Sequence, residues 1–183
     1  MFEKFLGIVT FALAIALAPL GTATAAAQSQ VAALPCANPA LPAAILDGPA
    51  TLSSNSALGT IRVGAPQGVL TLAVADDSGE RELGLMCVTR LRPRAGMLFV
   101  FPQSGEWDFW MKNTLISLDM IWLESNGRVT TIAEAVPAST VMTPDDAVAR
   151  RSGRGRYVIE LAAGEATKAG ITVGKRLPIV LRR

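Results

Sequence analysis

The sequence predicts a single mainly β (α+β) domain: a mostly antiparallel, strongly curved sheet or small barrel with two short helices. Short apolar runs recur between turn-forming residues, as they do in β-rich domains. Several of these runs alternate apolar and polar residues with a period of two, which indicates half-buried strands. Asn126-Gly127 lies between two apolar runs, and this dipeptide is the strongest short-range signal for an antiparallel hairpin.

Residues 1–27 have the pattern of a signal peptide that directs export. Residues 5–18 are apolar apart from Gly7 and Thr10, a length that suits the core of a signal rather than a membrane span. Two A-x-A cleavage motifs follow within residues 23–27. An uncleaved anchor is the alternative. We therefore expect a mature chain in the periplasm or the extracellular space, with no membrane span after cleavage.

The mature chain divides into an extension and a domain. Residues 28–59 are rich in Ala, Pro and Ser without a sustained period, so we expect an irregular N-terminal extension. Residues 60–183 form the β-rich domain. A capping-box-like start at Asp77 predicts a helix over residues 78–86, and one or two helical turns are expected over residues 164–169.

The strands follow from the apolar runs and the turns between them. Alternation is clearest over residues 107–112, where Trp107, Phe109 and Met111 share one face. Residues 135–155 contain two prolines and no periodic run, so they are predicted to form a long loop. The predicted strands are residues 60–63, 69–75, 97–101, 107–112, 119–124, 128–134, 157–161 and 176–181.

Two cysteines, Cys36 and Cys87, remain after the signal. In an exported protein such a pair suggests one disulfide. It would close a loop of roughly 50 residues and contribute about 4 kcal/mol on the chain-entropy model. Two free thiols are the alternative.

A set of short motifs is spread over residues 60–181: Ala75-Asp76, Glu80-Arg81, Gly84-Leu85-Met86, Gly96 to Phe101, Phe109 to Thr114, Leu118-Asp119, Asn126 to Val129, Tyr157 to Leu161 and Gly170-Ile171. Together these motifs resemble a known family, the domain of unknown function 192. The resemblance implies a compact, mostly β fold, often behind a signal peptide, with no agreed activity and no catalytic residues to transfer. Cys87 departs from the family pattern, which fits a lineage-specific disulfide to Cys36.

Composition excludes some chemistries. The chain has no histidine, which rules out Ser-His-Asp and Cys-His catalysis and histidine-based zinc sites. The net charge of +2 is too small to imply a nucleic-acid partner. The basic patch formed by Arg150, Arg151, Arg154 and Arg156 is expected to be a solvated Arg-Gly loop, with an anionic ligand or a phospholipid headgroup as the alternative.

The best candidate binding site follows the aromatic run of residues 99–110. Aromatic side chains with a few convergent polar groups are typical of small-ligand pockets. Lys112 could bind a carboxylate or phosphate, or act as an amine nucleophile if desolvated. The alternative is a structural turn in which Lys112 pairs with Asp119. The candidate ligand-binding residues are Trp110, Lys112, Asn113, Thr114 and Asp119.

Two other chemistries deserve consideration. Asp119 and Glu134, on the two arms of the predicted hairpin, could form a carboxylate pair for acid–base work. Methionines together with Cys87 could supply soft ligands for Cu(I), although Met more often fills cores. We expect no metal and no cofactor.

The sequence therefore predicts an exported, non-enzymatic binding or accessory protein of the cell envelope. Its partner is expected to be a small molecule, a glycan or an envelope protein, and not a nucleic acid. One alternative is a hydrolase or transferase that uses Lys112 or the carboxylates of Asp119 and Glu134. The other is a purely structural envelope factor.

Overall fold

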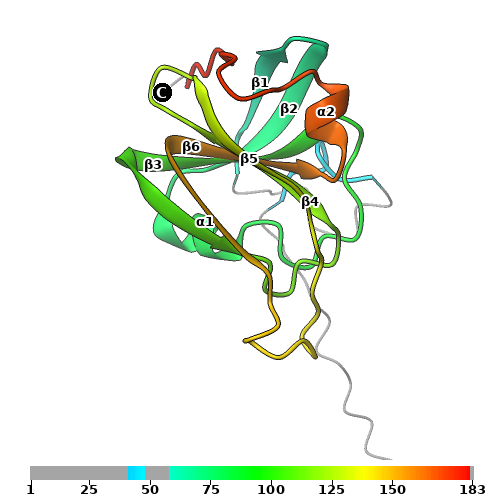
Figure 1. Ribbon diagram of the computed structural model, residues 1–183. Helices are drawn as coiled ribbons and strands as arrows, with labels where there is room; N and C mark the ends of the chain where they lie inside the picture. The colour runs from blue at the N-terminus through cyan, green and yellow to red at the C-terminus, as the bar shows by residue number, and fades with distance from the viewer. Residues whose placement is uncertain (1–40, 48–57, 182–183) are drawn as a thin grey trace, which may run out of the picture. The chain divides into compact units, whose positions relative to one another are not determined.

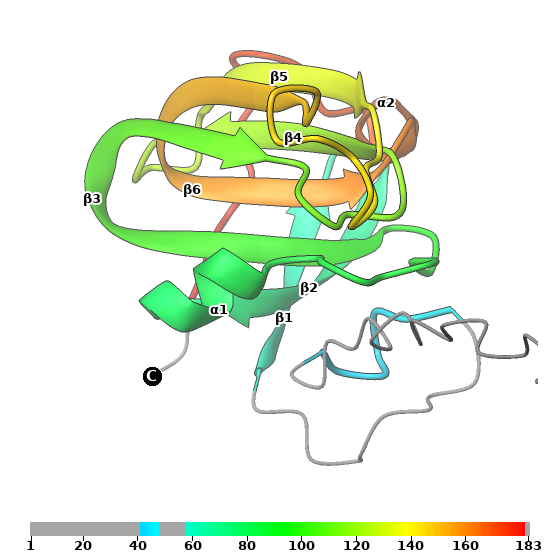
Figure 2. The same cartoon turned by 90° about the horizontal axis from the view of Figure 1, so that it is seen from below.

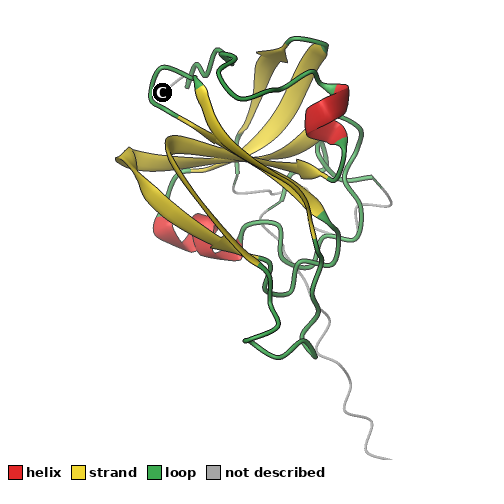
Figure 3. Ribbon diagram, in the orientation of Figure 1, coloured by secondary structure: helices red, strands yellow, loops and turns green. Residues whose placement is uncertain are grey.

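A computed structural model describes residues 41–47 and 58–181. Over these residues it shows a six-stranded sheet and two short helices (Figures 1 and 3), which confirms the predicted mainly β class. The sheet is not closed into a barrel. The elements are β1 (Thr60–Ala65), β2 (Gly68–Ala75), α1 (Ser78–Leu83), β3 (Ala95–Trp110), β4 (Leu118–Leu123), β5 (Val129–Val136), β6 (Arg150–Ala162) and α2 (Glu165–Lys168).

Some predictions concern residues outside the described part of the chain. The signal peptide at residues 1–27 and most of the extension at residues 28–59 lie there, and so does Cys36. Export and the Cys36–Cys87 disulfide therefore stay predictions. Among the described residues, no helix is long and apolar enough to cross a membrane.

The sheet order is β1-β2-β3-β6-β4-β5, so β6 lies in the interior between β3 and β4. All neighbouring pairs are antiparallel except β2 and β3, which the crossover through α1 makes parallel. Glu160 of β6 lies opposite Met97 of β3 on one side and Met120 of β4 on the other. This interior register decides how deeply the Glu160 side chain is buried.

β3 is one strand where the sequence predicts two. The predicted strands 97–101 and 107–112 and the segment between them form a single 16-residue strand that pairs with β6 on both sides of a register shift between Val100 and Gly105. Figure 2 shows β3 and β6 bending back together. The bend stacks Phe101 on Trp107, with ring centroids 3.9 Å apart.

The predicted loop over residues 135–155 is too long, because β6 begins at Arg150. The basic patch is therefore part of a strand, and the expectation of an Arg-Gly loop is wrong. Gly153 and Gly155 are buried, whereas Arg154 between them is exposed. A Cβ on Gly153 would lie 2.6 Å from the Trp122 ring, so glycine lets β6 pass close over that side chain.

The Gly153→Ala variant is expected to lose about 2 kcal/mol of stability, because Trp122 is fully buried and cannot yield easily. Gly59→Ala is the matched control, since a Cβ there meets no atom within 4 Å; its expected change is within about 0.5 kcal/mol. Urea denaturation of both variants measures the difference. Equal stabilities would contradict this account of the close approach.

The predicted last strand is wrong as well. Residues 176–181 are not a strand; only Arg176 forms an isolated bridge, to Arg128. Pro178 lacks a backbone N–H and limits pairing there.

The two faces of the sheet carry separate apolar clusters. Along β6, Val158 belongs to one cluster and Ile159 and Leu161 to the other, as alternation requires. Glu160 therefore lies on the Val158 face, which also carries Phe99, Met120 and Trp122. Along β4, Ile121 belongs to the opposite cluster, so Asp119 lies on the opposite face from Glu160.

Candidate functional site

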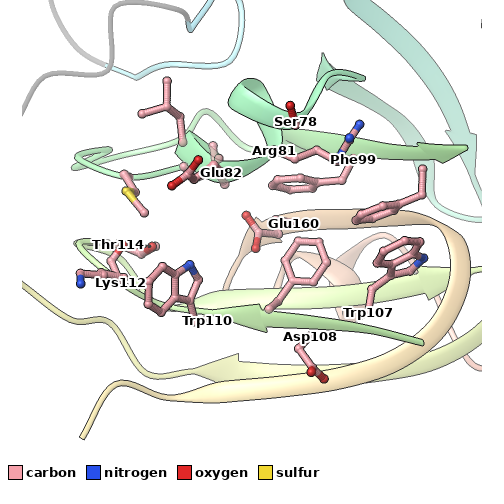
Figure 4. A pocket seen from close by; sticks show the side chains of 16 residues that line it. Ser78, Arg81, Glu82, Phe99, Trp107, Asp108, Trp110, Lys112, Thr114 and Glu160 are labelled. Carbon is pink, nitrogen blue, oxygen red and sulfur yellow. Dashed lines mark hydrogen bonds between the residues drawn. The ribbon is translucent and has the colours of Figure 1, made fainter. Parts of the chain in front are cut away.

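A pocket of about 280 Å³ lies on the Glu160 face of the sheet. The helix α1 and the residues after it form one wall, and the second half of β3 forms the facing wall (Figure 4). Glu160 lies between these walls among the aromatic side chains. Residues far apart in the sequence thus converge on one carboxyl group.

The first wall is fixed by the cap of α1. The Asp77 carboxylate accepts a hydrogen bond from the Glu80 N–H at 2.8 Å, and the Glu80 carboxylate accepts one from the Asp77 N–H at 3.2 Å. This reciprocal pair satisfies two otherwise unpaired helix donors. It sets the start of the helix that carries Arg81 and Glu82 to the pocket.

Arg81 ties this wall to β3. Its guanidinium donates to the backbone carbonyls of Asp76 at 2.6 Å and Val100 at 2.9 Å. Its Cζ also lies 5.2 Å from the centroid of the Phe101 ring. Because both interactions hold the guanidinium in place, Arg81 acts here as part of the wall.

The aromatic wall is well ordered. Phe99 and Phe109 meet edge to face at 4.9 Å, and Phe109 meets Trp122 at 5.9 Å. Trp107 donates from its indole Nε1 to the Gly155 carbonyl at 2.9 Å. Edge-to-face and stacked rings at these distances are favourable arrangements. The rings therefore form one packed wall of the pocket.

Glu160 is the unusual member of the site. Its side chain is 4% exposed, and no described residue donates a hydrogen bond to its carboxyl group. Burial raises its pKa to about 8, so most of the carboxyl is protonated at neutral pH. Buried polar groups almost always have partners, and an unpaired one in a native protein calls for an explanation. A ligand in the pocket would supply one.

Sequence reasoning missed Glu160 as a site residue. The signal was present: Glu160 is the single charged residue within the apolar run from Tyr157 to Leu161. A charge inside a fully apolar strand conflicts with the pattern of a buried strand, and such conflicts often mark functional positions.

Three of the sequence-predicted residues lie together at this pocket: Trp110, Lys112 and Thr114. Lys112 Nζ lies 3.2 Å from Asp145 Oδ1 and 5.0 Å from the Trp110 ring centroid. The predicted pairing of Lys112 with Asp119 is therefore wrong. Lys112 and Trp110 are partly exposed, at 37% for the Lys112 side chain and 36% for Trp110, so they lie near the mouth.

Asn113 and Thr114 shape the turn after β3. Asn113 has a φ of 52°, a left-handed conformation that Asn tolerates better than most residues, and its carbonyl accepts a hydrogen bond from the Cys87 N–H at 2.9 Å. Thr114 is buried and donates to the Lys112 carbonyl at 3.3 Å. The turn holds the segment that follows α1 against the end of β3.

The structure does not bring Asp119 to the pocket. Asp119 is fully buried on the opposite face, where its Oδ1 accepts from the Ala135 N–H at 2.9 Å and its Oδ2 from the Ala166 N–H at 3.0 Å. Glu134 is exposed and accepts a hydrogen bond from the Thr167 hydroxyl at 2.9 Å. Both carboxylate oxygens of Asp119 are thus used to fasten β5 and the start of α2.

Three of the methionines, Met97, Met111 and Met120, are buried in one apolar core cluster, whereas Met142 is 84% exposed and Met86 lines the pocket. Over residues 41–47 and 58–181, no group of three or more His, Cys, Asp or Glu side chains could hold a metal ion.

The fold and the site define a small β-rich domain with a pocket built around a buried carboxyl group. The chain belongs to the family of domain of unknown function 192, described as uncharacterized ACR, which it matches over residues 60–179. No curated protein matches the chain.

Two solved structures are similar to it. One, from Sinorhizobium meliloti 1021, is provisionally called a transcription regulator; it shares 36% identity with a TM-score of 0.56, and the alignment covers 67% of this chain and 93% of that one. The other is a protein of unknown function from Novosphingobium aromaticivorans DSM 12444. It shares 27% identity with a TM-score of 0.55, covering 78% of this chain and 98% of that one.

Proposed function

We propose that this protein is an exported, non-enzymatic binding protein of the cell envelope that holds a small molecule in the Glu160 pocket. One observation carries the proposal: a buried carboxyl group without a hydrogen-bond donor among the described residues faces a pocket whose aromatic wall is already formed. Such a pocket, largely apolar with a few placed polar groups, is the usual form of a small-ligand site. The signal-peptide pattern of residues 1–27 supports export.

The size of the pocket favours a small molecule over the other expected partners. Its volume of about 280 Å³ is just below the usual range of ligand pockets, which have volumes of roughly 300–1,000 Å³. A glycan chain or a protein segment would need a longer groove. These two partners are therefore alternative outcomes of the binding experiment below.

The positions of the polar groups favour binding over catalysis. Both oxygens of Asp119 already accept backbone hydrogen bonds, so they are not available as a base. Lys112 is ion-paired and partly exposed, whereas an amine nucleophile needs a desolvated site. None of the ion pairs among the described residues includes Glu160, so no charged partner is placed to relay its proton.

The arginines of β6 do not favour a nucleic-acid partner. Arg154 Nε lies 3.3 Å from Glu124, and Arg150 Cζ lies 5.0 Å from the Trp110 ring centroid. Neighbouring carboxylates and rings thus engage part of this basic strand. The regulator name of the Sinorhizobium protein is therefore not extended to this chain.

Thermal denaturation of the mature protein against a panel of metabolites, glycans and metal ions tests the proposal. A ligand at about 100 times its dissociation constant should add roughly 2.7 kcal/mol of stability. The Glu160→Gln variant keeps the shape of the side chain but not its acid, and should lose most of this gain. Glu106→Gln, an exposed carboxyl on β3, is the matched control and should keep it. A ligand that stabilises all three proteins equally would contradict the proposal.

A further inference from the structure

We infer that the ligand of the Glu160 pocket is a small organic cation, an amine or a quaternary ammonium compound, whose charged group lies against the Glu160 carboxylate and the surrounding rings. This inference rests on the proposed function and names the ligand class of the same site. Three features carry it: the missing partner of Glu160, the rings around it, and the balance of the other charges.

The first feature is the carboxyl group itself. A carboxylate only accepts hydrogen bonds, so its partner must bring a donor or a positive charge. None of the described residues supplies either to Glu160. A cationic ligand can supply both at once, and charge-assisted contacts are stronger than neutral ones.

The second feature is the aromatic wall. The faces of Phe, Tyr and Trp rings attract cations within about 6 Å of the centroid, and quaternary ammonium ligands are commonly held this way. Two rings of this pocket already hold cations of the protein: Arg81 lies 5.2 Å from Phe101, and Lys112 lies 5.0 Å from Trp110. Phe99 and Phe109 also line the space beside Glu160. No cationic side chain among the described residues lies over either of these two rings.

The third feature is charge balance. On α1, Arg81 is offset by the neighbouring Glu82, and at the mouth Lys112 is offset by Asp145 at 3.2 Å. At the rim, Arg150 of β6 lies 5.0 Å from the Trp110 ring centroid, and its charge is offset by Asp108 of β3, which points away from the pocket in Figure 4. An ionised Glu160 would therefore leave the site with one uncompensated negative charge. A ligand with one positive charge neutralises it, whereas an anion would add to it.

Binding of a cation must also be linked to pH. Burial keeps Glu160 largely protonated at neutral pH, so a cation binds together with the release of the Glu160 proton. The affinity for a permanent cation should therefore rise roughly tenfold per pH unit below about pH 8 and level off above it. A ligand that accepts a hydrogen bond from the protonated acid would show the opposite trend.

Choline and 3,3-dimethylbutan-1-ol are suitable probes because they have nearly the same shape and only choline is charged. Their affinities for the full mature protein can be measured by calorimetric titration at pH 6, 7, 8 and 9. At pH 9, choline is expected to bind at least about tenfold more tightly than the alcohol, in line with the worth of a desolvated cation–ring contact. Its affinity should rise with pH as described, while that of the alcohol should not.

Two variants show whether the charge of Glu160, rather than that of another carboxyl group, is responsible for choline binding. Glu160→Gln should weaken the binding of choline at pH 9 and remove its pH dependence while leaving the affinity for the alcohol unchanged, whereas Glu106→Gln should bind both probes like the wild type. The comparison of the two probes needs only the wild-type protein, so it holds even if Glu160→Gln folds poorly.

Equal binding of the two probes, an affinity for choline that falls with pH, or no choline binding at millimolar concentration would overturn the inference. These results would not by themselves contradict the proposed function. It would survive any of these results if a neutral or anionic ligand from the panel stabilised the wild type and lost its effect in Glu160→Gln.

Discussion

Glu160→Gln is expected to be more stable than the wild type at pH 8.5 and close to it at pH 5. Burial raises the pKa of Glu160 from 4.5 to about 8 in the folded state. Between these values the folded protein holds a proton that the unfolded chain has released. The stability of the wild type therefore falls as the pH rises through this window, and glutamine, which does not titrate, avoids the loss.

The size of this stability difference follows from the interval between the pKa of Glu160 in the unfolded chain and its pKa in the folded protein. Each pKa unit corresponds to about 1.4 kcal/mol, so the difference between the two proteins should approach the order of 4 kcal/mol above pH 8. Relaxation of the pocket or entry of water would reduce it. Urea unfolding at pH 5, 7 and 8.5, without ligand, measures the difference. Parallel pH profiles for the two proteins would contradict the assignment of Glu160 as a buried, unpartnered acid.

Such a gain in stability has a functional meaning. A residue whose replacement stabilises a protein is commonly retained for activity or binding, because function often needs a locally unfavourable arrangement. The same variant that gains stability at high pH is expected to lose ligand binding. Opposite effects of one substitution on stability and on binding would be difficult to explain if Glu160 had a purely structural role.

Asp119→Ala is expected to lose about 3 kcal/mol of stability or more. The substitution leaves the buried N–H of Ala166 and the partly buried N–H of Ala135 without their acceptor, and it removes a fully buried side chain from the sheet. Asp119→Asn keeps one acceptor oxygen and should lose less. Glu134→Ala, which removes an exposed carboxyl, is the control and should change stability by no more than about 0.5 kcal/mol.

Urea denaturation and ligand binding together decide the role of Asp119. A structural role predicts lower stability with unchanged ligand affinity in the Asn variant, since Asp119 lies on the other face of the sheet from Glu160. Lost affinity with unchanged stability would instead support the original prediction of Asp119 as a ligand-binding residue.

Local pattern was enough for much of the fold. Period-two alternation found β2, and two apolar runs on either side of the Asn-Gly pair found the β4–β5 hairpin, because these features depend on neighbours a few residues apart. The capping box at Asp77 likewise predicted α1, although Gly84, with a φ of 47°, ends the helix earlier than predicted.

Local pattern was misleading where the partner lies far away in the chain. The segment between the two predicted strands of β3 contains Pro102 and Gly105 and has the composition of a turn, yet the strand continues through it because β3 pairs with β6 on both sides. The glycines of the basic patch also suggested a loop. Gly153 is needed because β6 passes over the Trp122 ring, and Gly155 because β6 lies close against the Leu123 backbone, and no local pattern reveals these contacts.

By itself, the sequence determined the β-rich class, the family and the aromatic run that, with Lys112, lines one side of the pocket. Only the tertiary structure decided which carboxyl group lines the same pocket. Asp119 is close to Lys112 in the sequence, but alternation along β4 directs it to the opposite face. Glu160 is distant in the sequence, but its place on an interior strand beneath α1 buries it against the rings. Periodicity tells which residues share a face, whereas long-range pairing decides which faces meet.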